Sequence, residues 1–167
     1  MSNIKEIFVK TEQCTGCQSC KLACAVEHSQ SKNLFAALNE TVKPKSRLYV
    51  EWLPGNTKVP ILCRHCEDAP CVNACISGAT TRTDDGLVIT AADKCIGCWT
   101  CVMVCPYGVI GRDADYGKAY RCDRCQNDEN QAIKIRPVSQ PAPQAPCSMK
   151  LWKVFQKTGA NSYRKNL

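Results

Sequence analysis

Hydrophobic and polar positions alternate along this chain only over short stretches, each about one strand long. Residues 6–9 and 47–52 alternate in this way and predict strands. Two β-branched runs at 80–83 and 87–90 flank Asp84-Asp85-Gly86, and an Asp-Gly pair in that setting is typical of a tight hairpin. The pattern therefore predicts short strands, with one well-defined hairpin.

Helical signals are equally short. Residues 21–28, 98–104 and 31–40 are expected to form small helices, with the last cysteine of a cysteine group on each of the first two. The chain contains no apolar run of the ~18 residues that a membrane span needs. The first residues also lack the apolar run of a signal peptide, so we expect a cytoplasmic protein without a membrane span of its own.

Cysteines rather than apolar side chains dominate the sequence, with 15 among 167 residues. Twelve of them form three groups of four, and a fourth group begins with a C-x2-C pair. Groups one and three have the bacterial iron–sulfur spacing C-x2-C-x2-C-x3-C, and group two has two extra residues before its third cysteine. This internal repeat predicts duplicated ferredoxin-like units. Group one is Cys14, Cys17, Cys20 and Cys24; group two is Cys63, Cys66, Cys71 and Cys75; group three is Cys95, Cys98, Cys101 and Cys105; group four begins with Cys122 and Cys125.

The spacing distinguishes between the metals that thiolates prefer, which are zinc, copper(I) and iron–sulfur clusters. A structural zinc site usually draws two cysteines from each of two separated knuckles. Here four cysteines crowd into one short run, and a single ion would leave thiolates without a metal. In iron–sulfur proteins of this spacing the fourth cysteine ligates a different cluster, so no thiolate is left over. We therefore expect [4Fe–4S] clusters; a zinc-stapled interaction module is the alternative of another class, and a disulfide scaffold fits a reducing compartment poorly.

The formal charge of +7 does not indicate nucleic-acid binding. Residues 1–125 contain 15 basic and 13 acidic residues, a net of +2, whereas residues 126–167 contain 7 and 2, a net of +5. Metal-bound cysteines are thiolates, which lowers the charge of the first part further. The basic excess therefore lies mostly in the tail, and we expect no nucleic-acid partner.

No catalytic motif accompanies the cysteines. The sequence has no phosphate-binding loop, no dinucleotide fingerprint and no nucleophile–base pair in its motifs, so we expect an electron-transfer protein rather than an enzyme. Gly16 and Gly97 are expected to let the backbone aim N–H groups at cluster sulfides. His65, between two cysteines of group two, is interpreted as a polar loop residue, with a hydrogen bond to a cluster or ligation of it as the alternatives. His28 is interpreted as a helix-end or surface residue.

With all four groups in place, residues 3–125 resemble the four-cluster ferredoxin-like subunits of redox enzymes. Residues 59–75 and 93–112 look most like the iron–sulfur subunit of carbon monoxide dehydrogenase. The resemblance implies an α+β protein of two interleaved halves, each holding two [4Fe–4S] clusters, with short strands and helices around them. It implies electron transfer from the catalytic subunit of carbon monoxide dehydrogenase to an acceptor such as a membrane-associated hydrogenase. The alternative partners are a molybdopterin oxidoreductase or formate hydrogenlyase.

The resemblance also implies how the groups share their clusters. Each cluster would take three cysteines from one group and the last cysteine of a paired group, with group two paired to group three and group one to group four. Cys63, Cys66 and Cys71 would join Cys105; Cys95, Cys98 and Cys101 would join Cys75; Cys122, Cys125 and a third cysteine would join Cys24; Cys14, Cys17 and Cys20 would take the last cysteine of group four.

Group four departs from the family pattern. Only Cys147 follows its first pair, after a 21-residue gap, and Leu151 stands where the last ligand belongs. We therefore expect three to four clusters, with the first a [3Fe–4S] cluster, completed by a non-cysteine ligand, or absent. The domain prediction is a four-cluster domain at 1–125, with 57–112 as one half, and an atypical Pro/Gln-rich tail at 126–167. A reading-frame shift near codon 126, or disorder, would account for such a tail.

Overall fold

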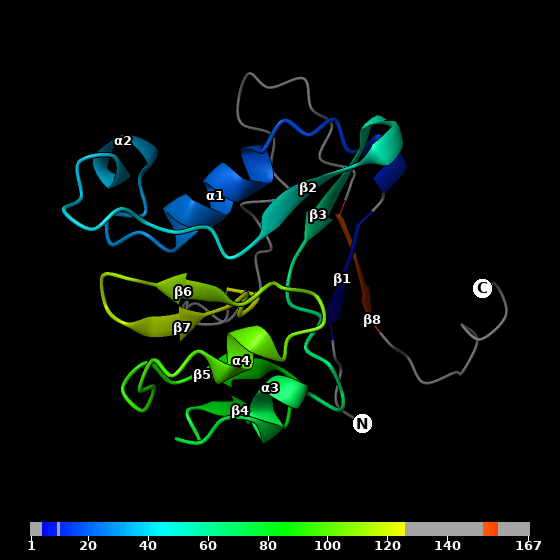
Figure 1. Cartoon of the computed structure of the whole chain (residues 1–167). Coiled ribbons are helices and arrows are strands. Elements are labelled where there is room, and N and C mark those ends of the chain that lie inside the picture. Colours follow the sequence, from blue (N-terminus) through cyan, green and yellow to red (C-terminus); the bar gives the residue numbers. More distant parts are fainter. Residues whose placement is uncertain (1–4, 10, 126–151, 157–167) are drawn as a thin grey trace, which may run out of the picture.

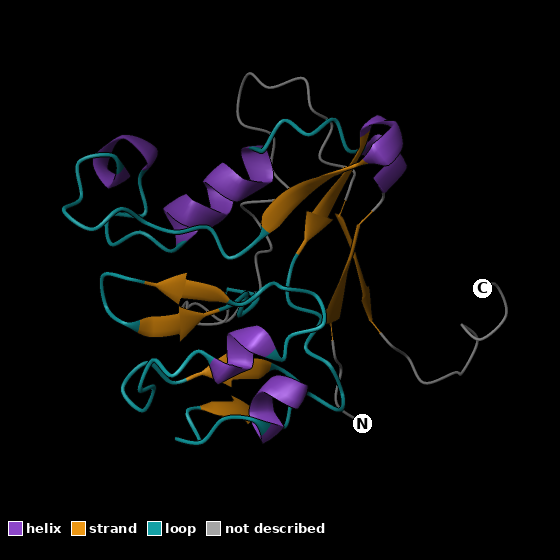
Figure 2. Cartoon of the chain, viewed as in Figure 1, coloured by secondary structure: helices purple, strands orange, loops and turns teal. Residues whose placement is uncertain are grey.

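The computed structural model describes residues 5–9, 11–125 and 152–156, which form an α+β fold of short elements (Figure 1). Small helices alternate with small strands along the chain (Figure 2). The predicted fold class is confirmed. The helices are α1 (Ser19–Glu27), α2 (Leu34–Ala37), α3 (Pro70–Asn73) and α4 (Thr100–Met103). The strands are β1 (Lys5–Val9), β2 (Tyr49–Leu53), β3 (Thr57–Ile61), β4 (Thr80–Arg82), β5 (Val88–Thr90), β6 (Gly111–Asp113), β7 (Lys118–Tyr120) and β8 (Trp152–Gln156).

All the strands pair antiparallel, in four separate two-stranded sheets. Three of these sheets are hairpins of neighbouring strands, β2–β3, β4–β5 and β6–β7. The fourth pairs β1 with β8, in the register Lys5 opposite Gln156. The tail thus contributes a strand at 152–156, while the remainder of the predicted tail, including Cys147 and position 151, lies outside the described residues.

The hairpin predicted at 80–90 is confirmed as β4–β5, with Thr80 opposite Thr90. The N–H of Thr83 donates to the carbonyl of Leu87 at 2.7 Å, which closes a three-residue turn around the Asp-Asp-Gly segment. The predicted strand at 6–9 is confirmed as β1, and the one at 47–52 as β2, shifted towards the C-terminus. The strands β3, β6, β7 and β8 were not predicted, and β6 and β7 have only three residues each, too few to show a period.

The helix predictions hold best where a cysteine run defines them. Cys24 lies on α1 as expected. The expectation for group three is wrong, because α4 ends at Met103 and Cys105 lies beyond it. Pro106 follows Cys105 and disfavours the helical region for the residue before it. The helix predicted over 31–40 is shorter in the structure, where α2 spans Leu34–Ala37. The Asn33 side chain caps it by accepting hydrogen bonds from the backbone N–H groups of Phe35 and Ala36.

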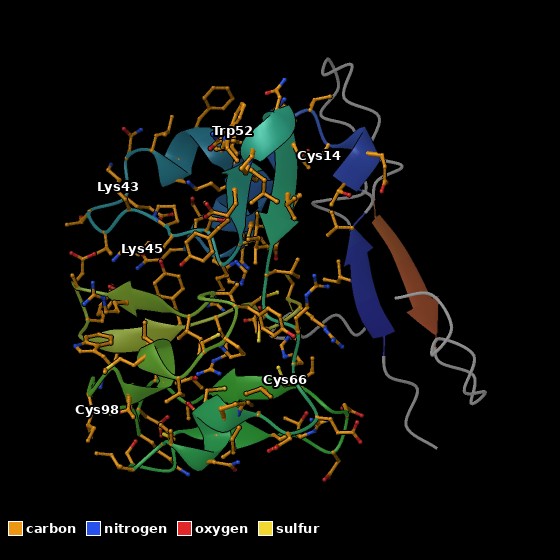
Figure 3. All side chains as sticks on the ribbon, turned by 45° about the vertical axis from the view of Figure 1, so that its right-hand side comes forward. Cys14, Lys43, Lys45, Trp52, Cys66 and Cys98 are labelled. Carbon is orange, nitrogen blue, oxygen red and sulfur yellow. The ribbon has the colours of Figure 1, made fainter. Side chains whose placement is uncertain are left out.

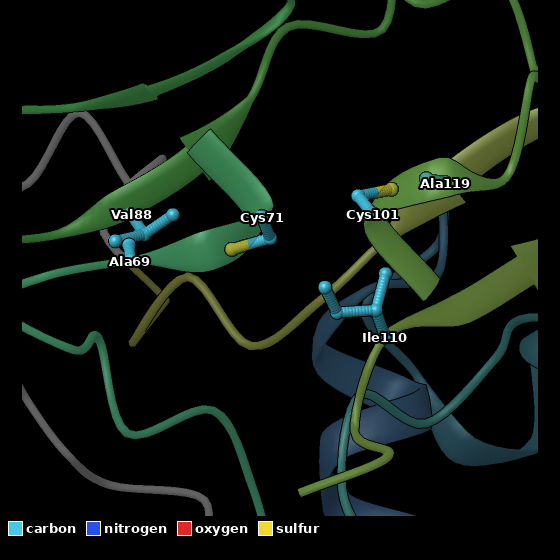
Figure 4. Close-up of a cluster of buried hydrophobic side chains, with 6 residues drawn as sticks. All are labelled: Ala69, Cys71, Val88, Cys101, Ile110 and Ala119. Atoms are coloured by element: carbon cyan, nitrogen blue, oxygen red, sulfur yellow. The ribbon is translucent and has the colours of Figure 1, made fainter. Parts of the chain in front are cut away.

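Cysteines take positions in the small buried core that leucine or valine would otherwise fill. One buried cluster contains Cys71 and Cys101 together with four apolar side chains (Figure 4). A second contains Cys24, Leu48 and Leu62. Of the described residues, only Leu87 and Val88 are large side chains that are fully buried. Apolar burial alone is therefore a weak source of stability here.

Gly97 is required both by its backbone and by its surroundings. Its φ is +69°, and a Cβ added there would lie 2.4 Å from the carbonyl oxygen of Gly117. We expect Gly97→Ala to cost about 1–3 kcal/mol, or roughly 5 °C in the unfolding midpoint, since both the strained φ and the clash oppose it. Anaerobic thermal unfolding of the cluster-loaded protein measures this. Gly108→Ala is the matched control, with φ +61° and nothing within 4 Å; an equal loss in both variants would contradict the clash.

Candidate metal centres

The same backbone turn recurs at the C-x2-C pair of every cysteine group. The residue before the second cysteine of each pair has a positive φ, the left-handed region that costs most residues energy. These residues are Gly16 (74°), His65 (50°), Gly97 (69°) and Arg124 (55°). In groups two and four the N–H of this residue hydrogen-bonds the thiol two positions earlier, which offsets part of the rise that burial causes in the pKa of Cys63 and of Cys122. The turn thus directs a backbone donor at a sulfur atom.

Group two meets the last cysteine of group three. Burial raises the pKa of the Cys63 thiol, and the charges of Cys71 and Cys105 raise it further. Cys63, Cys71 and Cys105 are therefore close enough for their charges to repel. We call the predicted set Cys63, Cys66, Cys71 and Cys105 the group-two site.

Group three meets the last cysteine of group two in the same way. Burial raises the pKa of Cys101, and the charges of Cys95, Cys71 and Cys75 add to this. The hydroxyl and N–H of Thr100 lower the pKa of the exposed Cys98, and Cys75 opposes them. We call the predicted set Cys95, Cys98, Cys101 and Cys75 the group-three site.

Group four meets the last cysteine of group one. Burial raises the pKa of Cys122 and of Cys125 to about 12, and the charge of Cys24 contributes to both shifts. These three cysteines form what we call the group-four site. Cys147, its predicted third cysteine, lies outside the described residues.

The remaining cysteines of group one lie together at the start of α1. Burial raises the pKa of Cys20 to about 11, and the charges of Cys17 and Cys14 raise it further. Within the described residues, the charges of Cys105, Cys75 and Cys24 thus act on the groups that the resemblance pairs with them, while Cys71 also acts on Cys101 and Cys63 on Cys122. Their role as cluster ligands stays a prediction.

A buried arginine lies against these cysteines and was not identified from the sequence. Arg121 is only 2% exposed. Its guanidinium Nη1 donates to the Cys71 sulfur at 2.9 Å, and its Nη2 donates to the Thr80 hydroxyl at 3.3 Å. A buried cation requires a negative partner. Cys71 supplies one as a thiolate, so the surroundings of Arg121 fit an anionic thiolate–metal site.

A second buried charge network adjoins the group-four site. The Nε2 of His28 lies 3.1 Å from Oδ1 of Asp123, and Arg47 pairs with the other carboxylate oxygen. Burial opposes both shifts, but the hydrogen bond with His28 and the charge of Arg47 lower the pKa of Asp123 to about 2. Hydrogen bonds with Asp123 and Cys24 raise the pKa of His28 to about 9, against the opposing charge of Arg47. The Arg47 N–H also donates to the Cys24 sulfur at 3.2 Å.

His28, interpreted from the sequence as a helix-end residue, does follow the end of α1. It also belongs to a group of possible ligand atoms, from His28, Asp123 and Cys125, that lie within 4.8 Å of one another. No local pattern pointed to this, because Asp123 is 95 residues away from His28 in the chain.

His65 is buried, and its hydrogen bonding restricts what its ring can do. The Val88 N–H donates to its Nδ1 at 3.0 Å. In a neutral imidazole the proton then lies on Nε2, which is a donor and not a metal ligand. Burial lowers the pKa of His65 to about 4, and the charge of Arg124 lowers it further, which favours the neutral ring. The Nε2 has no hydrogen-bond partner among the described residues.

Comparison with known proteins shows that the sequence matches one protein family and several individual relatives. The model of the 4Fe-4S dicluster domain matches residues 56–142. An "Iron-sulfur protein" of Rhodospirillum rubrum is 41% identical over 151 residues, covering 83% of this chain and 78% of the relative. The "Electron transport protein HydN" of Escherichia coli K12 is 37% identical over 140 residues, covering 74% and 77%. A tetrathionate reductase subunit of Archaeoglobus fulgidus is 36% identical over 122 residues, covering 71% and 54%.

Two features of the matches bear on the rest of the molecule. The family match ends 17 residues beyond Cys125 (142 − 125), so it runs into the segment predicted as a tail. No helix within the described ranges is long and apolar enough to cross a membrane.

Proposed function

Since this chain belongs to the 4Fe-4S dicluster family, we propose that it relays single electrons from carbon monoxide dehydrogenase to a redox acceptor such as a membrane-associated hydrogenase. At the coarser level, it is an iron–sulfur electron-transfer subunit of oxidoreductase complexes that holds multiple [4Fe–4S] clusters. Membership of a family whose domain holds 4Fe-4S clusters disfavours the alternative of a zinc-stapled interaction module.

The cysteines would hold the clusters, and the clusters when bound supply reversible one-electron chemistry. The protein fixes the order in which these sites adjoin. Cys20 and Cys24 lie on α1 and belong to the group-one and group-four sets. The charge of Cys63 raises the pKa of Cys122, so the group-two and group-four sites adjoin. The charge of Cys71 raises the pKa of Cys101, so the group-two and group-three sites adjoin as well. These contacts support a single row in the order one, four, two, three.

The two ends of this row are accessible from outside. Cys17 of group one and Cys98 of group three are both exposed. Cys14 and Cys98 lie towards opposite ends of the molecule (Figure 3). This arrangement supports an entry site for electrons at one end and an exit site at the other.

Exposed apolar side chains surround both ends. At the group-one end the Trp52 ring, itself 60% exposed, lies next to Gly16. At the group-three end, four exposed apolar residues lie within two positions of a cysteine in the sequence: Ile76, Ile96, Met103 and Tyr107. Exposed apolar surface of this kind is typical of protein docking sites. It supports partner proteins at the two ends of the row.

The choice of carbon monoxide dehydrogenase rests on the motifs at 59–75 and 93–112, which resemble the iron–sulfur subunit of that enzyme. The Rhodospirillum relative supports an iron–sulfur protein without naming its partner. A second candidate donor is a formate hydrogenlyase or molybdopterin enzyme. The similarity to a tetrathionate reductase subunit supports a partner other than carbon monoxide dehydrogenase, and the similarity to the electron transport protein HydN supports the electron-transfer role in either case. In either case we propose a cytoplasmic protein that reaches the inner membrane only through a partner.

The test is reduction by each donor under anaerobic conditions. Protein purified without oxygen is first analysed for iron, sulfide and zinc; about 16 iron and 16 sulfide mean four clusters, and about 12 of each mean three. It is then mixed with carbon monoxide dehydrogenase and carbon monoxide, or with formate and a formate-oxidising enzyme. We expect the visible cluster absorption to bleach at least tenfold faster with the first donor. Faster bleaching with formate would transfer the proposal to the second candidate, and zinc without sulfide would refute both.

A further inference from the structure

We propose that Arg121, assisted by His65, holds the group-two site at a higher reduction potential than the neighbouring group-three site. The inference rests on the proposed function, because it requires clusters at both sites. It makes the group-two site the more easily reduced of this adjoining pair.

The first observation is the position of the Arg121 charge. The guanidinium donates to the sulfur of Cys71, a group-two ligand, at 2.9 Å, and the residue is 2% exposed. No carboxylate of the described residues forms an ion pair with it. A positive charge that is shielded from water and not paired with a carboxylate is screened less than an exposed charge, so it acts more strongly on the nearest anion. That anion is the Cys71 thiolate and any cluster bound to it.

The second observation is a pair of buried donors without acceptors. Nε of Arg121 and Nε2 of His65 have no hydrogen-bond partner among the described residues. Leaving a buried donor unpaired costs about 1–3 kcal/mol. Sulfur atoms of a bound cluster are acceptors that the protein alone does not contain. Both residues are close to group two. Arg121 donates to the Cys71 sulfur through Nη1, and His65 lies between Cys63 and Cys66 in the sequence.

The third observation is that His65 occupies a position that favours glycine. Groups one and three place Gly16 and Gly97 at this positive-φ residue of the turn, whereas group two places His65 there. A left-handed conformation costs a non-glycine residue about 1 kcal/mol or more. Val88 fixes the ring through Nδ1, which leaves the Nε2–H as a rigid donor in the same turn as Cys63 and Cys66.

The group-three site has weaker donors. The Thr80 N–H lies 3.3 Å from the Cys75 sulfur, and the Thr100 hydroxyl lies 3.5 Å from the exposed Cys98 sulfur. The Ser77 hydroxyl also lies 3.7 Å from the Cys75 sulfur, and all these donors to sulfur are neutral. The cation beside this site, the Lys118 ammonium, donates to the carbonyl of Cys95 at 2.5 Å and not to a sulfur atom. Net charge, hydrogen bonds to sulfur and solvent exposure set cluster potentials, and a buried cation stabilises the reduced, more negative state. Arg121 also acts on Cys101, but its direct contact is with group two, so the larger effect falls there.

The experiment is a redox titration of the anaerobic, cluster-loaded protein followed by EPR. The group-two signal is assigned as the one missing in Cys66→Ala. In Arg121→Met we expect this signal to titrate at a lower potential, by at least a tenfold change in the reduction equilibrium, which is about 59 mV for one electron. Arg121→Lys, which keeps the charge, should restore part of the shift. Lys45→Met is the control, because it also removes one positive charge, but from half-buried ion pairs with Asp113 and Asp115 that include no cysteine.

Iron and sulfide analysis of each variant separates this inference from the proposed function. If the wild-type protein binds no clusters, the proposed function fails and the inference fails with it. If Arg121→Met does not assemble, His65→Leu provides the measurement, and its group-two signal should also shift to lower potential. Full iron content with group-two midpoints equal to those of Lys45→Met, or a larger shift of the group-three signal, would overturn the inference.

Discussion

Removal of iron and sulfide is expected to unfold this protein. Its buried core is small and built partly from the cysteines that would hold the clusters, namely Cys24, Cys71 and Cys101. Once the metal is removed, burial favours protonated thiols at Cys122 and Cys125, whose pKa it raises to about 12. Metal binding in such a domain is therefore a large part of the folding free energy.

The measurement is circular dichroism of protein treated anaerobically with a chelator and a mild oxidant, then kept in excess thiol so that no disulfides form. We expect the cooperative thermal transition to disappear and near-ultraviolet signals from packed aromatic residues to be lost. Adding iron and sulfide back should restore both. An apoprotein that keeps a cooperative transition within a few degrees of the loaded protein would show that the apolar core suffices.

The sequence predicted what depends on local spacing. The cysteine groups repeat at fixed intervals, so their turns, the helix carrying Cys24 and the hairpin around Gly86 were all predictable from neighbouring residues. The α+β class followed, and the family comparison confirms it. By analogy with Cys24, Cys105 was predicted to lie on a helix. The helix α4 ends before it, because Pro106 disfavours a helical conformation at Cys105.

What the sequence did not predict depends on contacts between distant segments. Arg121 lies 50 residues from Cys71 along the chain, and Asp123 lies 76 residues from Arg47. Each is an ordinary charged residue in its local context, and only the fold buries it beside a sulfur atom or another charge. His65 was identified from the sequence as a loop residue between two cysteines. The orientation of its ring depends on strand β5, where the N–H of Val88 donates to Nδ1. Buried polar groups of this kind need three-dimensional structure to be recognised.

The sharing of clusters between groups two and three is expected to make two particular cysteine substitutions equivalent. If Cys75 and Cys98 ligate the same cluster, Cys75→Ala and Cys98→Ala should each abolish the same EPR signal. The double variant should then lose no more than about four iron, because the second substitution affects a site already lost. The charge of Cys75 acting on Cys98 supports this expectation.

The matched control reverses the outcome. Cys66 and Cys75 belong to one group but to different predicted clusters, so Cys66→Ala/Cys75→Ala should lose two EPR signals and about eight iron. If the four cysteines of each group instead ligated one cluster, the two results would be reversed. Cys75→Ala/Cys98→Ala would then lose about eight iron, and the control would lose about four. Because both alternatives contain the same cysteines and the same total iron, only their pairing decides the result. The pairing is also what places the group-two and group-three sites side by side, as a row of adjoining electron carriers requires.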